Sequence, residues 1–151
     1  MVYLVDDDPG VIKALSRLLR ARGHDVKSYS SPQAFLEEHD VAVPGCVVLD
    51  VSMPGLDGLE IQRVLTAASG YHRPVVFVTG KGDIPTGVRA MKAGAIDFLT
   101  KPVKDTDLLE AVSRAEERDA ESRRHHSEME SMLAKVSNLT PREREVFTHV
   151  V

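Results

Sequence analysis

The chain of 151 residues has no tryptophan, only one cysteine and no long apolar run. The single cysteine, Cys46, excludes an internal disulfide and a zinc site built on cysteines. It lies in the apolar run Cys46–Leu49, where a thiol usually behaves as a small buried hydrophobic residue. No apolar stretch approaches the roughly 18 residues of a transmembrane helix, and the N-terminus lacks the basic region of a signal peptide. We therefore expect a cytoplasmic protein without membrane contact.

An excess of positive charge is also missing. The net charge is −4, whereas chains that grip phosphate backbones are usually basic, so these residues alone are not expected to bind DNA well. Hydrophobic residues make up 42% of the chain and aromatic residues 5%, which predicts a sizeable core that is mainly aliphatic. The length fits one domain with a tail.

Short apolar runs alternate with helical patterns along the first part of the chain. The runs predict five strands, at Val2–Val5, Val26–Tyr29, Cys46–Leu49, Val75–Val78 and Ile96–Leu99. Apolar residues at helical spacing separate them, as in Val11, Leu15 and Leu19, and again after Gly58. Strands joined by helices form parallel sheets, and continuous apolar strands indicate that both faces are covered. We expect an α/β fold with a five-stranded parallel sheet.

Several residues are typical of helix ends. Ser31 followed by Pro32 predicts a helix start with a serine cap, and Asp105 can cap the last helix of the sheet domain. Gly23 suits the position just after a helix, and Gly94 interrupts the pattern of Val88 and its neighbours. These signals place the helices between the predicted strands.

The chain changes character after about residue 116. Residues 116–128 are almost wholly polar but contain neither glycine nor proline, so the preceding helix can continue. A heptad seam runs from Leu108 to Val136 in alternating steps of four and three, and its middle positions Asp119, Ser122 and His126 are polar. A coiled-coil dimer and a solvated helical linker are both compatible with this pattern.

A second helix start follows near the end of the chain. Thr140 and Glu143 have the spacing of a capping box, and Pro141 fits the first helical position. We interpret this helix as the beginning of a further domain. The expected organisation is a sheet domain at residues 1–116, a helical linker at 117–138 and the truncated start of another domain at 139–151.

Polar residues follow four of the predicted strands. Asp6 and Asp7 come after the first strand, Asp50 after the third, Thr79 after the fourth and Lys101 after the fifth. The carboxyl ends of parallel strands lie along one edge of a sheet, where ligands bind in folds of this kind. We therefore expect these side chains to converge, although each alone is ordinary in a turn or a helix cap.

The chemistry of these residues is complementary. Three nearby carboxylates repel one another, and a divalent cation such as Mg²⁺ would remove that repulsion. A carboxylate can attack phosphorus to give an acyl phosphate, while the metal neutralises charge on the transferring oxygens. Lys101 would add a positive charge, and the hydroxyl of Thr79 could donate a hydrogen bond to a bound phosphoryl group.

Four segments together resemble the receiver domain of bacterial two-component response regulators. They are Val5–Asp8, Val48–Gly58, Val78–Gly80 and Asp97–Pro102, within a resemblance that spans residues 2 to about 116. It implies a five-stranded flavodoxin-like fold and a cis peptide between Lys101 and Pro102. It also implies that Asp50 is the phosphoacceptor, that Thr79 and Phe98 form a switch pair, and that Lys101 contacts the phosphoryl group. The metal ligands would be Asp6, Asp7, Asp50 and the backbone carbonyl of Ser52.

Two further segments refine the resemblance. Val75–Ile84 is similar to the FixJ-type subgroup, and Leu139–Val146 resembles the opening of a LuxR-type helix-turn-helix domain. The implied partners are a sensor histidine kinase, a second copy of the chain after phosphorylation, and DNA through the missing C-terminal domain of a parent protein. The alternative is a receiver that acts only through protein contacts.

An enzymatic alternative is disfavoured by the residues after Asp50. Phosphohydrolases that resemble the haloacid dehalogenase group carry a second aspartate two residues after the nucleophile, where this chain has Ser52. The chain also leaves little room for a substrate cap. We therefore expect a switch and not an enzyme.

Overall fold

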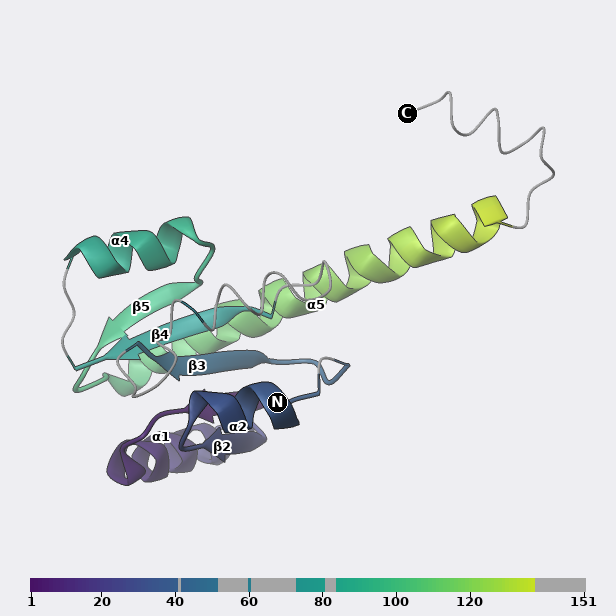
Figure 1. Cartoon of the computed structure of the whole chain (residues 1–151). Helices are drawn as coiled ribbons and strands as arrows, with labels where there is room; N and C mark the ends of the chain where they lie inside the picture. Colours follow the sequence, from purple (N-terminus) through teal and green to yellow (C-terminus); the bar gives the residue numbers. More distant parts are fainter. Residues whose placement is uncertain (41, 52–59, 61–72, 81–83, 138–151) are drawn as a thin grey trace.

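The computed structural model describes residues 1–40, 42–51, 60, 73–80 and 84–137. It contains a five-stranded sheet in the order β2-β1-β3-β4-β5, in which every neighbouring pair is parallel (Figure 1). The strands are β1 (Val2–Val5), β2 (Val26–Tyr29), β3 (Cys46–Asp50), β4 (Val75–Thr79) and β5 (Asp97–Thr100). The expected α/β fold is confirmed, and the strands differ from the predicted ranges by a single residue at most at either end.

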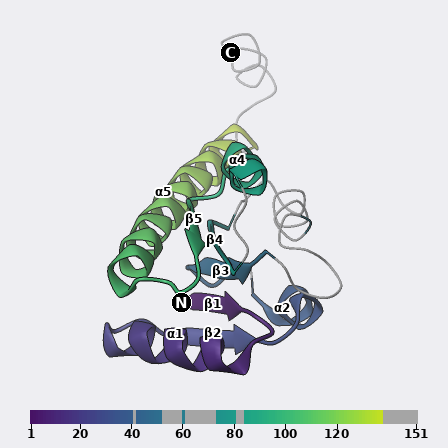
Figure 2. The ribbon, with the colours of Figure 1, turned by 90° about the vertical axis from the view of Figure 1, so that its left-hand side faces the viewer.

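Helices cover both faces of the sheet. They are α1 (Pro9–Ala21), α2 (Pro32–Glu38), α4 (Ile84–Lys92) and α5 (Asp105–Ser137); the helix predicted after Gly58 lies outside the described residues. One core cluster joins α1 and α5 to the sheet, through residues such as Leu19, Leu108 and Val48. The other joins α2 and α4 to the opposite face, with Phe35 and Phe77 at its centre. Figure 2 shows α1 and α5 together on one side and α2 on the other.

The three central strands are fully buried, and the two edge strands are less so. This explains why the apolar runs of β1, β3 and β4 were the clearest signals in the sequence, since both of their faces pack against helices. Cys46 is 0% exposed and belongs to the core, as expected of a buried thiol.

The helix caps largely follow the sequence. Asp8 caps α1 by accepting the N–H of Gly10, and Ser31 caps α2 by accepting the N–H of Ala34. Gly23 follows α1 with φ of 89°, a conformation that favours glycine. Asp105 is the first residue of α5, so it lies in the first helical turn instead of preceding it. There its negative charge interacts favourably with the positive end of the helix dipole.

Helix α5 is one continuous helix of 33 residues, about 50 Å long at 1.5 Å per residue. The seam positions Leu108, Val112, Ala115 and Asp119 are buried in the sheet domain. Residues 124–135 are all exposed, and Met129, Met132 and Leu133 are more than half exposed. The helix therefore packs along the sheet with its first half and projects beyond it with its second (Figure 1). Among the described residues no helix is both long and apolar enough to cross a membrane.

Candidate functional site

The polar residues that follow the strands meet at one edge of the sheet. Asp6 directly follows β1, and Asp50 ends the neighbouring strand β3. Thr79 ends β4 and pairs in register with Thr100 of β5, one residue before Lys101. Because all the strands are parallel, these are all carboxyl ends, as the sequence predicted.

An acidic cluster forms the centre of this edge. Asp6, Asp7 and Asp50 each offer a carboxylate oxygen, and the three oxygens lie within 4.8 Å of one another. Asp6 and Asp50 are 2% and 5% exposed, whereas Asp7 is exposed to solvent. Asp6 Oδ1 accepts the N–H of Asp8 at 2.9 Å, which holds its other oxygen toward the cluster. The cluster is thus buried on one side and open on the other.

Lys101 joins the acidic cluster as a cation. Its Nζ lies 2.9 Å from Asp6 Oδ2 and 3.3 Å from Asp50 Oδ2. Burial disfavours the charged ammonium, but the hydrogen bond to Asp6 and the negative charges of Asp50 and Asp6 outweigh it and raise the pKa of Lys101. Its backbone N–H donates to Thr79 O at 2.7 Å, and its peptide bond to Pro102 is cis, as expected.

The donor set fits a hard divalent cation. Three carboxylates and one ammonium leave the cluster two negative charges in excess, and oxygen ligands of this kind suit Mg²⁺. Asp6, Asp7 and Asp50 could hold the ion from one side while water or phosphate oxygens complete its coordination. The predicted fourth ligand, the Ser52 carbonyl, lies outside the described residues and stays a prediction.

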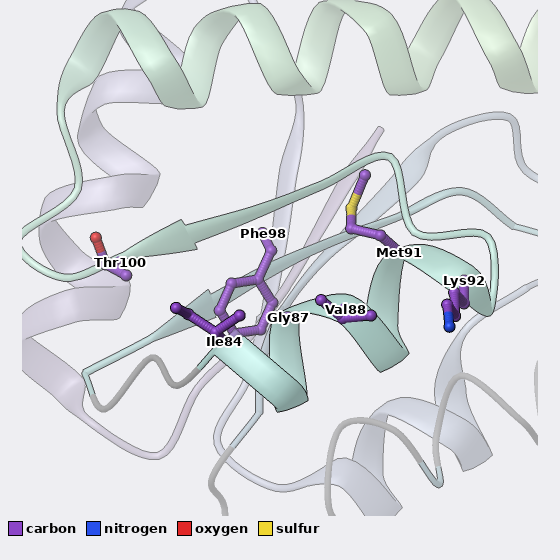
Figure 3. Close-up of a pocket in the computed structure, with 7 residues that line it drawn as sticks. All are labelled: Ile84, Gly87, Val88, Met91, Lys92, Phe98 and Thr100. Carbon is purple, nitrogen blue, oxygen red and sulfur yellow. The ribbon is translucent and has the colours of Figure 1, made fainter.

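Thr79 and Phe98 lie on the same face of the sheet. Phe98 pairs with Phe77, and Thr79 is two residues further along the same strand, so the alternation of side chains places all three on the face covered by α4. Thr79 is 1% exposed. The ring of Phe98 is partly buried and points toward α4, away from the core of the sheet (Figure 3).

The ring forms one wall of a shallow apolar hollow between α4 and β5. Its lining includes Ile84, Gly87, Val88 and Met91 (Figure 3). A Cβ built at Gly87 would lie 3.5 Å from Phe98 Cδ1, so the ring rests directly against the helix at its glycine. Sequence reasoning missed Gly87; a glycine inside a helix was the only available signal, because such a residue often marks close packing.

The family of the chain follows from its match to a family model. The model for the response regulator receiver domain matches residues 2–113. The chain belongs to the response regulator receiver domain family. Solved structures of other proteins resemble this receiver. The response regulator StyR is 44% identical, with a TM-score of 0.84, over 97% of this chain and 74% of that chain. The structure of FixJ-N has 41% identity and a TM-score of 0.70 over 77% of this chain and 92% of that one.

Curated relatives of the receiver include a response regulator and a transcriptional regulatory protein. The response regulator protein TmoT of Ectopseudomonas mendocina is 42% identical over all of this chain and 68% of its own length. Nodulation protein W of Bradyrhizobium diazoefficiens is 42% identical over 97% of this chain and 64% of its own. The transcriptional regulatory protein FixJ of Azorhizobium caulinodans is 40% identical over 99% of this chain and 71% of its own length. The receiver chain thus spans about two thirds of the length of these relatives.

Proposed function

We propose that this receiver accepts a phosphoryl group on Asp50 from a sensor histidine kinase, with Mg²⁺ held by Asp6, Asp7 and Asp50. The observation that carries the proposal is the buried Asp50 carboxylate, placed within 4.8 Å of two further carboxylates and 3.3 Å from Lys101 Nζ. A nucleophile, a place for a divalent ion and a fixed cation are therefore within one site.

In the proposed transfer, an oxygen of Asp50 attacks phosphorus and forms a new O–P bond. The P–N bond to the kinase histidine breaks, and its electron pair stays on the imidazole nitrogen. Bound Mg²⁺ would neutralise charge on the transferring oxygens. Lys101 then shifts its ammonium toward the phosphoryl oxygens, since it already contacts Asp50, and Thr79 donates its hydroxyl hydrogen to them.

The product carries the signal through Thr79 and Phe98. Phosphorylation adds charge and acceptor oxygens at the end of β3. If Thr79 moves toward them, it vacates space on the face of the sheet that it shares with Phe98, and the Phe98 ring leaves the hollow on α4 to fill it. The surface of α4 and β5 changes as a result, which makes this region a two-state element biased from Asp50.

The changed surface would promote pairing of two copies of the chain. Ile84, Val88 and Met91 are exposed apolar residues on α4, at 83%, 45% and 46%, and they border the hollow that Phe98 leaves. In a longer parent protein, pairing would control transcription through a C-terminal DNA-binding domain. The relatives named as transcriptional regulators favour this output over a receiver that acts only through protein contacts. Such a protein works in the cytoplasm.

The decisive experiment measures the intact mass of the chain after incubation with acetyl phosphate. One added phosphoryl group is expected with Mg²⁺ and none with EDTA. Asp50→Asn should take none, whereas Asp25→Asn, which changes an exposed aspartate directly before β2, should behave like the unmutated chain. An adduct that persists in Asp50→Asn, or that forms in EDTA, would contradict the assignment.

Two further measurements test the switch and the absence of catalysis. Thr79→Ala should still accept a phosphoryl group but fail to change its oligomeric state in analytical ultracentrifugation. A normal shift in that variant would refute the coupling. No turnover of a generic phosphomonoester is expected, because the chain has Ser52 where phosphohydrolases of this chemistry carry a second aspartate.

A further inference from the structure

A second polar cluster lies at the opposite edge of the sheet from Asp50. It surrounds the loop between α2 and β3, of which residues 39, 40 and 42–45 are described. This loop leads into Cys46, the first residue of β3, so the cluster is separated from Asp50 by the length of that strand, about 13 Å. Neither the phosphoacceptor site nor the hollow on α4 uses any of its residues.

Asp119 of α5 is the buried acid of this cluster. It is 2% exposed, and its Oδ2 accepts the backbone N–H of Gly45 at 2.8 Å. The same oxygen accepts Nε of Arg123, one helical turn further on, at 2.9 Å. A buried carboxylate is costly unless it is paired and hydrogen-bonded, and Oδ2 meets both conditions here. Oδ1 is buried and has no hydrogen-bond partner among the described residues. The contact ties residue 119 of the helix to a loop that lies 74 residues away in the sequence.

Arg123 extends this contact by a full turn of the helix. Its Nη1 donates to Ala42 O at 3.2 Å, and its Nη2 donates to Val43 O at 2.9 Å. One planar guanidinium therefore bonds to Asp119 on its own helix and to two carbonyls of the loop. A fixed fork of donors such as this sets the direction of a helix more tightly than a single flexible contact.

Arg73 also holds the loop, and it shares the Val43 carbonyl with Arg123. Arg73 is 4% exposed, and its Nη atoms donate to the carbonyls of Asp40, Val43 and Gly45 at 2.9, 3.0 and 3.0 Å. Its guanidinium also lies 4.7 Å from the centre of the Tyr3 ring of β1. The loop is thus anchored to the sheet, and a helix that bonds to it is anchored as well.

We propose that Asp119 and Arg123, acting on the loop held by Arg73, form a clamp that sets the direction in which α5 leaves the receiver. Arg123 is the last residue of α5 with a hydrogen bond to this loop among the described residues, and every residue from 124 to 135 is exposed. The clamp therefore places the mechanical boundary of the receiver after Arg123, although the sequence becomes polar some seven residues earlier. Asp119 and Arg123 are positioning residues for whatever follows the helix.

The proposal is tested by the spread of distances between the receiver and the far end of α5. Lys13 of α1 and Ser131 of α5 are both exposed, and the native Cys46 is buried. Spin labels on Lys13→Cys and Ser131→Cys allow the distance distribution to be measured by pulsed electron paramagnetic resonance. Diluting the labelled chain with an excess of unlabelled chain restricts the measurement to distances within one copy.

The expected result is a narrow distribution in the unmutated background and a distribution at least twice as wide in Arg123→Ala. Arg124→Ala, which removes the exposed neighbour, should leave it narrow. Arg123→Lys should give a distribution of intermediate width, since lysine keeps the positive charge but lacks the planar set of guanidinium donors. A narrow distribution in Arg123→Ala overturns the proposal, even if its melting temperature falls, because a merely stabilising role would change Tm and not the direction of the helix.

Asp119→Asn is the second variant and should also widen the distribution. If it does not fold cooperatively, Arg123→Ala alone decides, since that side chain is 24% exposed and its removal leaves the core intact. The measurement needs no phosphorylation, so failure of the clamp and failure of the phosphoacceptor assignment are independent outcomes.

Discussion

Replacement of Asp50 by asparagine should stabilise the metal-free protein, although Asp50 is the proposed phosphoacceptor. Two unit charges of like sign no more than 4.8 Å apart repel by at least roughly 3.5 kcal/mol at an effective dielectric constant near 20. Asp50 faces two such charges, while Lys101 Nζ at 3.3 Å attracts it by roughly 5 kcal/mol on the same scale. The repulsions exceed the attraction by roughly 2 kcal/mol, and the exposure of Asp7 reduces this figure through solvent screening.

We therefore expect Asp50→Asn to raise the free energy of unfolding by about 1–2 kcal/mol in EDTA. Saturating Mg²⁺ should shrink or reverse this difference, because the unmutated cluster binds the ion more tightly and binding to the native state stabilises it. Urea unfolding followed by circular dichroism measures both conditions. Asp25→Asn is the matched control and should change the free energy by no more than about 0.5 kcal/mol in either buffer.

Either of two results would contradict this expectation. If Asp50→Asn lowers the stability in EDTA, repulsion among the three carboxylates does not dominate the metal-free site. If the difference between the two proteins is the same with and without Mg²⁺, the cluster is not the metal site.

The other predictions concern Lys101, Cys46 and two glycines. Lys101→Met should lower metal-free stability by about 3 kcal/mol, because it leaves the buried Asp6 and Asp50 carboxylates without their cation. It should also raise Mg²⁺ affinity in calorimetry, since it removes a competing cation; weaker Mg²⁺ binding would contradict this. In the folded protein the pKa of Lys101 is raised above 10.5, so its contribution to stability is complete below pH 10.5. That contribution is lost as the pH rises through the folded pKa. The stabilities of the unmutated chain and of Lys101→Met should therefore converge at high pH. Burial and the nearby acids raise the pKa of Cys46 to about 12, so thiol reagents should modify it only in urea. Gly45→Ala should destabilise the fold strongly, because its Cβ would overlap the Met1 carbonyl oxygen and φ at this position is positive, whereas Gly23→Ala should cost about 1 kcal/mol in thermal unfolding.

The sheet, and the set of residues that meet at its carboxyl edge, could be predicted from the sequence because both depend on local patterns. A buried parallel strand is a short apolar run, and β1, β3 and β4 are buried over their whole length. The rule that parallel strands end along one edge then brings Asp6, Asp50 and Lys101 together without any knowledge of distances. The direct ion pair between Lys101 and Asp6 could not be foreseen, since it depends on how far a flexible side chain reaches.

The role of Asp119 shows where sequence reasoning ends. In the heptad pattern it is a polar position that weakens a coiled coil, but in the structure it is buried and bonded to Gly45. Its partner is a backbone N–H in a distant loop, and no local pattern records that pairing. The first half of the seam is therefore the face that packs on the sheet, and only the part after Arg123 is exposed for other contacts.

The continuity of α5 has a consequence for any domain that a longer chain attaches to it. Each residue of an α-helix turns the chain by about 100° and advances it by about 1.5 Å. Deleting one residue from the exposed stretch at 124–135 would thus swing the attached domain around the axis by more than a quarter turn, whereas deleting seven would restore its orientation to within about 20°. The helix therefore fixes the rotation of an attached domain about its axis more strictly than its distance from the receiver. Hybrid regulators that are fused within this helix should preserve that rotation.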